Sequence, residues 1–349
     1  MAIQGQFKQD APRFNSIING DMVIWQRGTT ITDATTATTN ADDSYIADRW
    51  VLLSDGNNIV DVTRSTDAPD GGSKNSCALD VETANKKFGI VQLIEQVNCH
   101  DMLGETVSLT FKARASSVAN FDDVRCAIIA WSGTADAMTS DVVSAWAVEG
   151  TNPTLVTSWT YENTPADLNI TTSWAEYKIE NVAIDTAGAT NIAVFIYSNV
   201  TGTTIGEIIY ITDVMINKGT TAGAFERKSF NTVEYECLRY YETSMTWGTT
   251  GQYAGQRLVR GNSSATFGAT VGNVDGIRLR HRKRATPTFT IYHQDGTAGA
   301  IYGPVHTGAK TTGVAAQHTM DLGCLFVVKA SAFVQGGTYY YAYTAESEL

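Results

Sequence analysis

Four aromatic residues in turn-rich, polar stretches are the side chains best suited to bind a ligand. Trp131, Trp146, Trp159 and Tyr161 lie in the segments WSGTAD, SAWAVEGTNP and TSWTYENTP, where Gly, Ser and Thr predict loops. An exposed indole offers a flat apolar face against which a sugar ring can stack, and nearby Asn and Asp side chains can take its hydroxyls. The alternative is that these rings close one end of a β-sandwich or pack on a neighbouring subunit. Packing is the commoner role of a large aromatic side chain.

A basic ladder is the second candidate site. Arg278, Arg280 and Arg282 alternate along the chain, so we expect their side chains to share one face of a strand. Such a face could bind anionic sugars or phosphates. We favour the other interpretation, in which the ladder makes ion pairs with the acidic part of the chain or with a neighbouring subunit.

The sequence contains no pattern typical of catalysis. None of the histidines has HExxH spacing and no GxSxG motif occurs, the five histidines being His100, His281, His293, His306 and His318. Carboxylates are plentiful, but no pair stands out for general acid and base work. We therefore predict that the protein is not an enzyme.

Composition and charge limit the possible partners. The chain has 349 residues and a net charge of −11, which divides into −13 for residues 1–228 and +2 for residues 229–349. An acidic body argues against nucleic acid, which proteins bind by neutralising phosphates. The five cysteines are widely spaced without a CxxC pair, so we expect them to be reduced and buried. We see no signal peptide and no apolar run long enough to span a membrane.

The order of polar and apolar segments predicts an all-β protein of two parts. Residues 1–14 are polar and aperiodic, and we expect an extended N-terminal arm there. About eight to ten short strands with turns between them predict a jelly roll or β-sandwich over residues 15–228. A linking helix is predicted within 229–245, with Asn231 as its N-cap and Glu234 completing a capping box. Short strands over 246–349 predict a second, small β-sandwich.

Four blocks in a fixed order carry a resemblance to a known family. They are NSIINGDMVIWQRG, YIADRW, TSWTYENTPADLNITTSWAEY and DVMINKGTTAGAFERKSFNTVEYECLRYYE. This series resembles bacteriophage virion proteins of the tail-fibre and head-fibre kind, whose leading domain is similar to a carbohydrate-binding-module jelly roll. The basic run over 278–284 departs from the family pattern, which has an apolar strand there.

The resemblance to jelly rolls also suggests a cation site. If the first and last strands are neighbours, as in such jelly rolls, Asn19, Asp21, Asp48 and Asp213 could converge, and oxygen ligands of this kind suit a structural Ca²⁺. The alternative is that these acidic residues keep loops soluble. We expect no other cofactor.

The last strand of the sequence, TYYYAYTA, suggests self-association. Neighbouring side chains of a strand face opposite ways, so Tyr339, Tyr340 and Tyr341 would leave at least one large ring outside a monomer. A ring of this size is better placed against a symmetry mate or a ligand. Members of the family that the chain resembles commonly form trimers, and we predict a homotrimer.

Three functions are consistent with these features. The first is a virion fibre or spike-like protein that recognises a glycan on the host surface. The second is a decoration or adaptor protein of the head or tail that binds no ligand, and the third is the carbohydrate-binding module of a polysaccharide-degrading system. We expect the protein to be made in the cytoplasm of a bacterial host and used in the virion, with residues 1–14 contacting other virion proteins. We expect neither nucleic acid nor a membrane as a partner.

Overall fold

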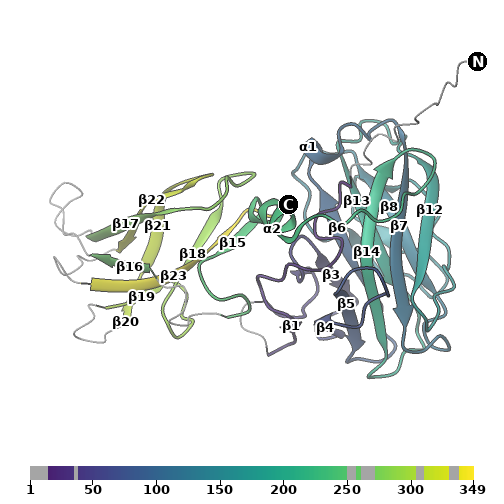
Figure 1. The fold of residues 1–349 in the computed structure, drawn as a ribbon, viewed down its shortest axis with the longest axis horizontal. Coiled ribbons are helices and arrows are strands. Elements are labelled where there is room, and N and C mark those ends of the chain that lie inside the picture. Colours follow the sequence, from purple (N-terminus) through teal and green to yellow (C-terminus); the bar gives the residue numbers. More distant parts are fainter. Residues whose placement is uncertain (1–14, 35–37, 250–256, 261–271, 304–309, 330–337) are drawn as a thin grey trace, which may run out of the picture.

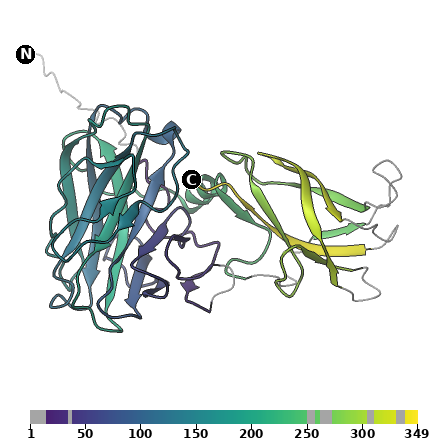
Figure 2. The same ribbon diagram turned by 180° about the vertical axis from the view of Figure 1, so that it is seen from behind.

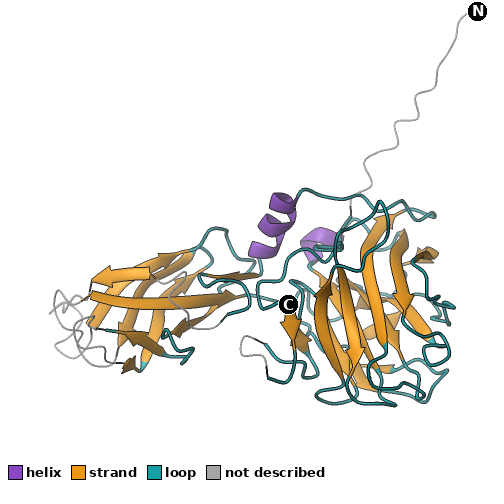
Figure 3. Ribbon diagram, turned by 60° about the horizontal axis from the view of Figure 1, so that its bottom comes forward, coloured by secondary structure: helices purple, strands orange, loops and turns teal. Residues whose placement is uncertain are grey.

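The computed structural model describes residues 15–34, 38–249, 257–260, 272–303, 310–329 and 338–349. Two β-rich bodies lie side by side along the long axis of the molecule, with helix α2 (Phe230–Leu238) and the C-terminus between them (Figures 1 and 2). Figure 3 shows that the rest of the described chain is almost entirely strand and loop. The predicted all-β fold is therefore confirmed.

The first body is a sandwich of two six-stranded antiparallel sheets. The first sheet has the order β1 (Thr30–Ile31), β4 (Val60–Ser65), β5 (Ser76–Val81), β14 (Ile208–Lys218), β7 (Thr106–Ala115) and β12 (Ala175–Ala183). The second sheet has the order β11 (Trp159–Tyr161), β8 (Val124–Trp131), β13 (Asn191–Ser198), β6 (Phe88–Ile94), β3 (Val51–Ser54) and β2 (Ser44–Tyr45).

The second sheet is buried on both faces. Every residue of β6 and β13 is buried, which explains why FGIVQLI and NIAVFIYS read as continuous apolar runs rather than alternating ones. One face packs on the first sheet around Trp50, Phe88 and Phe111. The opposite face is covered by the segment that carries the short hairpin β9 (Val143–Ala145) and β10 (Thr154–Leu155).

Residues 15–28, whose sequence predicts a first strand interrupted at Asn19-Gly20, form no strand in the structure. Asn19 and Met22 have φ angles of 57° and 54°, so the chain cannot stay extended there. The segment instead lies against β14, where the backbone N–H of Val214 donates to the Gly20 carbonyl at 3.0 Å. A Cβ on Gly20 would lie 2.1 Å from the Val214 carbonyl oxygen, so this approach requires glycine.

Helix α2 is shorter than predicted and begins earlier. Its N-cap is Ser229, whose hydroxyl accepts a hydrogen bond from the Thr232 N–H, so the prediction of Asn231 as the cap is wrong. Glu234 is not in a capping box and instead pairs with Arg280 at 3.4 Å. The buried face of the helix packs Val233 and Cys237 on the 18–24 segment.

Strand β15 (Tyr241–Thr243) follows the helix and joins the second body. There β23 (Thr338–Glu346) pairs with β15, β16 (Arg257–Arg260), β18 (Thr288–Tyr292) and β19 (Ala300–Tyr302), and β19 continues to β20 (Lys310–Thr312). A three-stranded sheet has the order β17 (Gly272–Arg278), β22 (Gly323–Lys329) and β21 (Val314–Met320). Strands β20 and β21 were not predicted, and a predicted strand over 266–271 lies outside the described residues.

The tyrosines of β23 alternate as a strand requires. Tyr339, Tyr341 and Tyr343 are buried in the core of the second body. Tyr340, on the opposite face, is half-buried, with its ring centroid 6.2 Å from that of Tyr302. No ring of these four is fully exposed in the protomer, so the homotrimer remains a prediction without this support.

Candidate functional site

The four aromatic residues proposed to bind sugar lie together, but as packing residues. Trp159 is only 6% exposed, and its ring centroid lies 5.4 Å from that of Trp131. Trp146 packs edge-on against Tyr197 at 6.3 Å. Trp131, Trp146 and Tyr161 are half-buried.

The reason is that the segment carrying β9 and β10 covers the outer face of the second sheet. All four rings belong to the hydrophobic cluster on the outer face of that sheet, with Met138, Val142 and Phe195. The turn-rich segments look exposed in sequence because their partners are strands distant along the chain. The expected exposed indole is wrong for Trp159, and the alternative of rings that close the sandwich describes this cluster better.

Three of the four residues suggested as Ca²⁺ ligands, Asn19, Asp48 and Asp213, are held by protein partners. The Asn19 side-chain oxygen accepts from the N–H groups of Val23 and Ile24, and both oxygens of Asp48 accept from Gln26 at 2.7 Å. Burial, the largest influence, raises the pKa of Asp48.

Asp213 has protein partners of its own. It forms an ion pair with Lys112 at 3.1 Å and accepts a hydrogen bond from Ser73. Burial raises the pKa of Asp21, and the charge of Asp213 adds to this effect. Within the described ranges, no group of three or more His, Cys, Asp or Glu side chains is arranged to hold a metal ion.

The basic ladder does not lie on one strand. Strand β17 ends at Arg278, and the chain beyond it is irregular. Arg280 pairs with Glu234 and with Glu242, both at 3.4 Å, while Arg282 pairs with Asp321 at 3.3 Å. Two of the three arginines are thus in ion pairs, with helix α2, β15 and the β21–β22 turn rather than with the acidic jelly roll.

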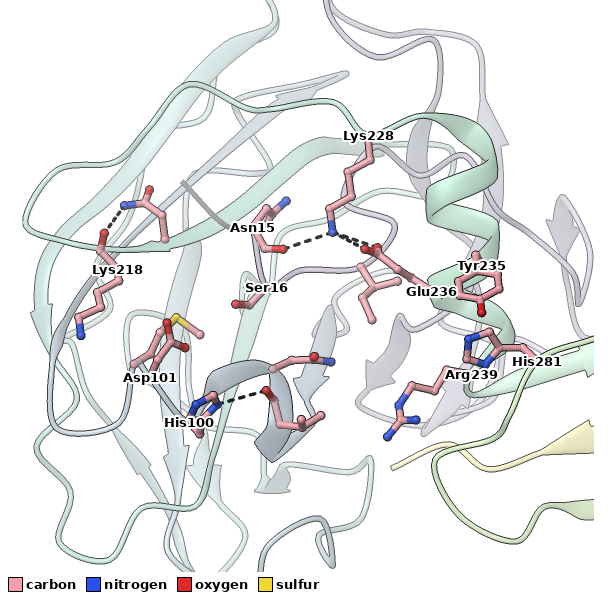
Figure 4. Close-up of a pocket in the computed structure, with 15 residues that line it drawn as sticks. Asn15, Ser16, His100, Asp101, Lys218, Lys228, Tyr235, Glu236, Arg239 and His281 are labelled. Atoms are coloured by element: carbon pink, nitrogen blue, oxygen red, sulfur yellow. Dashed lines mark hydrogen bonds and ion pairs between the residues drawn. The ribbon is translucent and has the colours of Figure 1, made fainter. Parts of the chain in front are cut away.

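A hollow of about 870 Å³ lies at the junction of the two bodies, and we call it the junction groove. Its lining comes from the start of the described chain, helix α1 (Gln96–Cys99), the end of β14, helix α2 and the loop after β17 (Figure 4). The lining residues are Asn15, Ser16, Ile18, Val97, Asn98, His100, Asp101, Met102, Asn217, Lys218, Lys228, Tyr235, Glu236, Arg239 and His281.

An exposed aromatic ring forms one wall of the junction groove. Tyr235 is 61% exposed, and its ring contacts that of His281 edge to face at a centroid distance of 4.1 Å. Val97 of helix α1, 60% exposed, also lines the groove. The lining also includes the hydroxyl of Ser16, the amide of Asn98 and the carboxylate of Asp101, so the groove combines apolar and hydrogen-bonding surface.

The cations of the junction groove are paired with carboxylates. Lys228 donates to both oxygens of Glu236 at 2.9 Å and to the Asn15 carbonyl at 3.3 Å (Figure 4). Arg239 donates to both oxygens of Glu95 at 2.7 and 2.8 Å. Burial opposes ionisation of Glu95, but the bonds from Arg239 and Tyr240 outweigh it and hold the pKa of this carboxyl below its usual range.

The two bodies are joined by ion pairs that water barely reaches. Arg27 and Arg49, whose side chains are 5% and 2% exposed, both bind Glu348, itself 4% exposed. Arg27 also pairs with Glu346 at 3.3 Å. Burial alone would lower the pKa of both arginines, and the charge of Glu348 raises it instead.

Aromatic rings lie against the two arginines of these ion pairs, and we call the pairs and rings together the junction clamp. The Arg49 guanidinium lies 3.7 Å from the ring centroid of Tyr240, and the Arg27 guanidinium lies 3.8 Å from that of Tyr241. The Tyr45 hydroxyl donates to the Leu349 carbonyl at 2.9 Å. The side chains of Glu346 and Glu348 and the backbone of Leu349 are therefore bound to the first body.

A second buried pair lies under helix α2. Lys283 is fully buried and donates to Glu242 at 2.9 Å and to the Leu238 carbonyl at the end of the helix. Burial, the largest influence, lowers the pKa of Lys283. The loop after β17 is thus fixed to β15 and to the end of helix α2.

The sequence did not identify this junction as a single structure. Its residues lie in WQRG, ADRW, CLRYYE and the terminal ESEL, and three of these four segments belong to the blocks that carry the resemblance to virion proteins. Charged residues inside otherwise apolar blocks, such as Arg27 and Arg49, were the available signal. Such residues are seldom buried unless they are paired.

Comparison with known proteins gives no family. No protein-family model matches the chain, and no curated protein matches it. Solved structures with some likeness include the enzymatically active domain of tailspike protein 4 from bacteriophage CBA120 (16% identity, TM-score 0.34, covering 59% of this chain and 21% of that one). They also include a carbohydrate-binding module of the β-sandwich superfamily (12% identity, TM-score 0.33, covering 58% of this chain and 62% of that one). A Stig cyclase from Fischerella is a third (11% identity, TM-score 0.34, covering 58% of this chain and 96% of that one).

These structures comprise a binding module and two enzymes, at identities under 25% and TM-scores under 0.5. The chain spans about a fifth of the tailspike chain. The likeness therefore leaves the function to be argued from the geometry of this chain. Among the described residues, no helix is both long and apolar enough to cross a membrane.

Proposed function

We propose that this protein is a phage virion fibre or spike-like structural protein that binds a host-surface glycan in the junction groove. The observation that supports a glycan ligand is Tyr235, whose side chain is 61% exposed at the wall of the junction groove. The groove has a volume of about 870 Å³ and is lined in part by polar side chains. The virion assignment rests on the order of the four sequence blocks.

The chemistry of the junction groove suits a sugar. The open face of Tyr235 provides apolar contact for the C–H groups of a pyranose ring, and His281 holds the tyrosine in place. Asn98, Asp101 and Ser16 offer donors and acceptors for its hydroxyl groups. Lys228 and Arg239 already bind carboxylates, so the groove has little to offer a polyanion.

The junction clamp supports binding because it holds the groove in its open shape before a ligand arrives. The lining comes from both bodies, and the pair of Arg49 with Glu348 fixes those bodies relative to each other. Lys283 ties the loop after β17 to the end of helix α2. A site whose walls need not be ordered on binding loses less entropy when the ligand enters.

A second candidate function is a head or tail decoration or adaptor protein that binds no ligand. The observation that favours it is the burial of Trp159 and the half-burial of Trp131, Trp146 and Tyr161. In either role we propose a homotrimer used in the virion, with residues 1–14 contacting other virion proteins.

The test is binding of labelled purified protein to host cells and competition with phage adsorption. We expect wild-type protein to bind, and Tyr235→Ala to bind at least tenfold more weakly, because a contact of this kind contributes about 1.4 kcal/mol or more. Ile205→Ala, a substitution at an apolar side chain 62% exposed outside the groove, is the matched control and should bind like wild type.

Two outcomes would contradict the proposal. If wild-type protein binds no host cell, the decoration or adaptor role takes its place. If wild-type protein binds and Tyr235→Ala binds equally well, the glycan site lies elsewhere on the chain.

A further inference from the structure

A second groove lies on the open face of the jelly roll, away from the junction. It encloses about 580 Å³ over the outer face of the first sheet, and we call it the sheet groove. Its lining is formed by the loop 67–70 between β4 and β5, by Lys112 and Arg114 of β7, and by residues 172–176 at the start of β12. None of the predicted sugar-binding residues lies in it.

We propose that the sheet groove is a second carbohydrate site, which takes a neutral, hydroxyl-rich oligosaccharide. Trp174 lies at its edge and packs against Tyr210 of β14, with ring centroids 6.3 Å apart and planes at 62°. Tyr210 stands opposite Arg114 in the register of β14 with β7, and the Arg114 guanidinium lies 4.4 Å from its ring centroid. Trp174 and Arg114 therefore line the groove, and Tyr210, which is not among the lining residues, contacts both and supports them.

The orientation of the tryptophan is fixed before any ligand arrives. The indole N–H of Trp174 donates to Asp67 at 2.9 Å, and Asp67 is held in turn by Arg114. Arg114 also donates to the Thr172 carbonyl at 3.3 Å, which ties the loop before β12 to the sheet. Burial opposes ionisation of Asp67, but the bonds from Arg114 and Trp174 outweigh it and lower the pKa of this carboxyl.

The charges select a neutral ligand. The lining contains the carboxylates of Asp67, Asp70 and Glu176 and two cations. Both cations are engaged, Arg114 with Asp67 and Lys112 with Asp213. A uronic acid or sulfated sugar would meet net negative charge and would have to break an ion pair, whereas sugar hydroxyls can donate to the same carboxylates without that cost.

The two grooves are independent sites. They share no lining residue. Tyr210, which packs on Trp174 beside the sheet groove, and Lys218, which lines the junction groove, are eight residues apart along β14, a separation of about 25 Å at the usual rise. Two such sites on one chain would let a long polysaccharide, or two of its branches, engage both and gain avidity. This inference does not depend on the junction groove, because different residues form it.

The test is calorimetric titration of the full chain with neutral gluco-, galacto-, manno- and xylo-oligosaccharides, and with uronic-acid and sulfated oligosaccharides, at millimolar concentration. We expect at least one neutral oligosaccharide to bind with at least tenfold preference over the anionic ones. Trp174→Ala should weaken that binding at least tenfold, and Trp174→Phe, which keeps a ring, should weaken it less.

Two variants make the result specific. Glu176→Gln alters a lining residue whose side chain is 37% exposed, so it should fold and should bind the neutral sugar severalfold more weakly. Tyr235→Ala, in the other groove, should leave this affinity unchanged. Binding that resists both Trp174→Ala and Glu176→Gln, a preference for anionic sugars, or no binding of any neutral sugar would overturn the proposal.

Discussion

Removal of the Glu348 carboxylate should destabilise the protein far more than its position at the end of the sequence suggests. Glu348 is the shared partner of Arg27 and Arg49, and all three side chains are at most 5% exposed. Glu348→Gln keeps the shape of the side chain and removes its charge. Both guanidinium groups then stay buried with less negative charge beside them to offset the cost of removing them from water. Breaking a buried ion pair in this way is strongly destabilising.

The loss in the free energy of unfolding depends on the contacts that Arg27 and Arg49 keep in the variant. Breaking a buried pair by removing one partner typically costs about 3 to 5 kcal/mol. Arg27 would keep Glu346 at 3.3 Å, and Arg49 would keep the Leu93 carbonyl at 2.7 Å and the face of Tyr240. We therefore expect a loss near the lower end, about 3 kcal/mol, from a total free energy of unfolding of about 5 to 15 kcal/mol.

The assay is urea denaturation, followed by far-UV circular dichroism and tryptophan fluorescence so that separate unfolding of the two bodies would be seen. Glu346→Gln is the matched control, because Glu346 pairs with the same Arg27 but is 46% exposed. It should cost less than about 1 kcal/mol. The reasoning is refuted if the two variants lose equal stability.

Two further predictions concern acid and thiol chemistry. Glu95 has a lowered pKa in the folded protein, so its bonds to Arg239 and Tyr240 stabilise the fold above the unfolded value of about 4.3, and this contribution is lost as pH falls through the folded pKa. The urea midpoint should therefore drop on acidification below about pH 4, and Glu95→Gln should lower it at pH 7 and flatten the drop; an unchanged slope would rule Glu95 out as the cause. All five cysteines are free and buried, and burial raises the pKa of Cys99 to about 12, so Ellman's reagent should detect no thiol in the native protein and five after denaturation. A thiol that reacts rapidly in the folded protein would contradict this burial.

Strand positions and fold class could be read from the sequence. The sequence predicts a strand over Thr288–Tyr292, and β18 has these bounds. It predicts another over Ser76–Glu82, which is one residue longer than β5. Hydrophobic period and turn residues act over a few neighbours, so they remain visible in one dimension. The same local signals predict an interruption at Asn19-Gly20 but not that residues 15–28 form no strand, because a partner distant in sequence holds this segment: the N–H of Val214 donates to the Gly20 carbonyl.

The candidate sites could not be read in the same way. Trp159 lies in a turn-rich segment but is covered by the segment that carries β9 and β10. Trp174, whose alternation with polar neighbours predicts a core residue, lies instead at the edge of an open groove beside Arg114 of β7. The sequence by itself determined which residues can form strands, since alternation and turn chemistry are local. Only the tertiary structure decided which rings face water and which charges are paired, because Arg49 and Glu348 meet across 299 residues of chain.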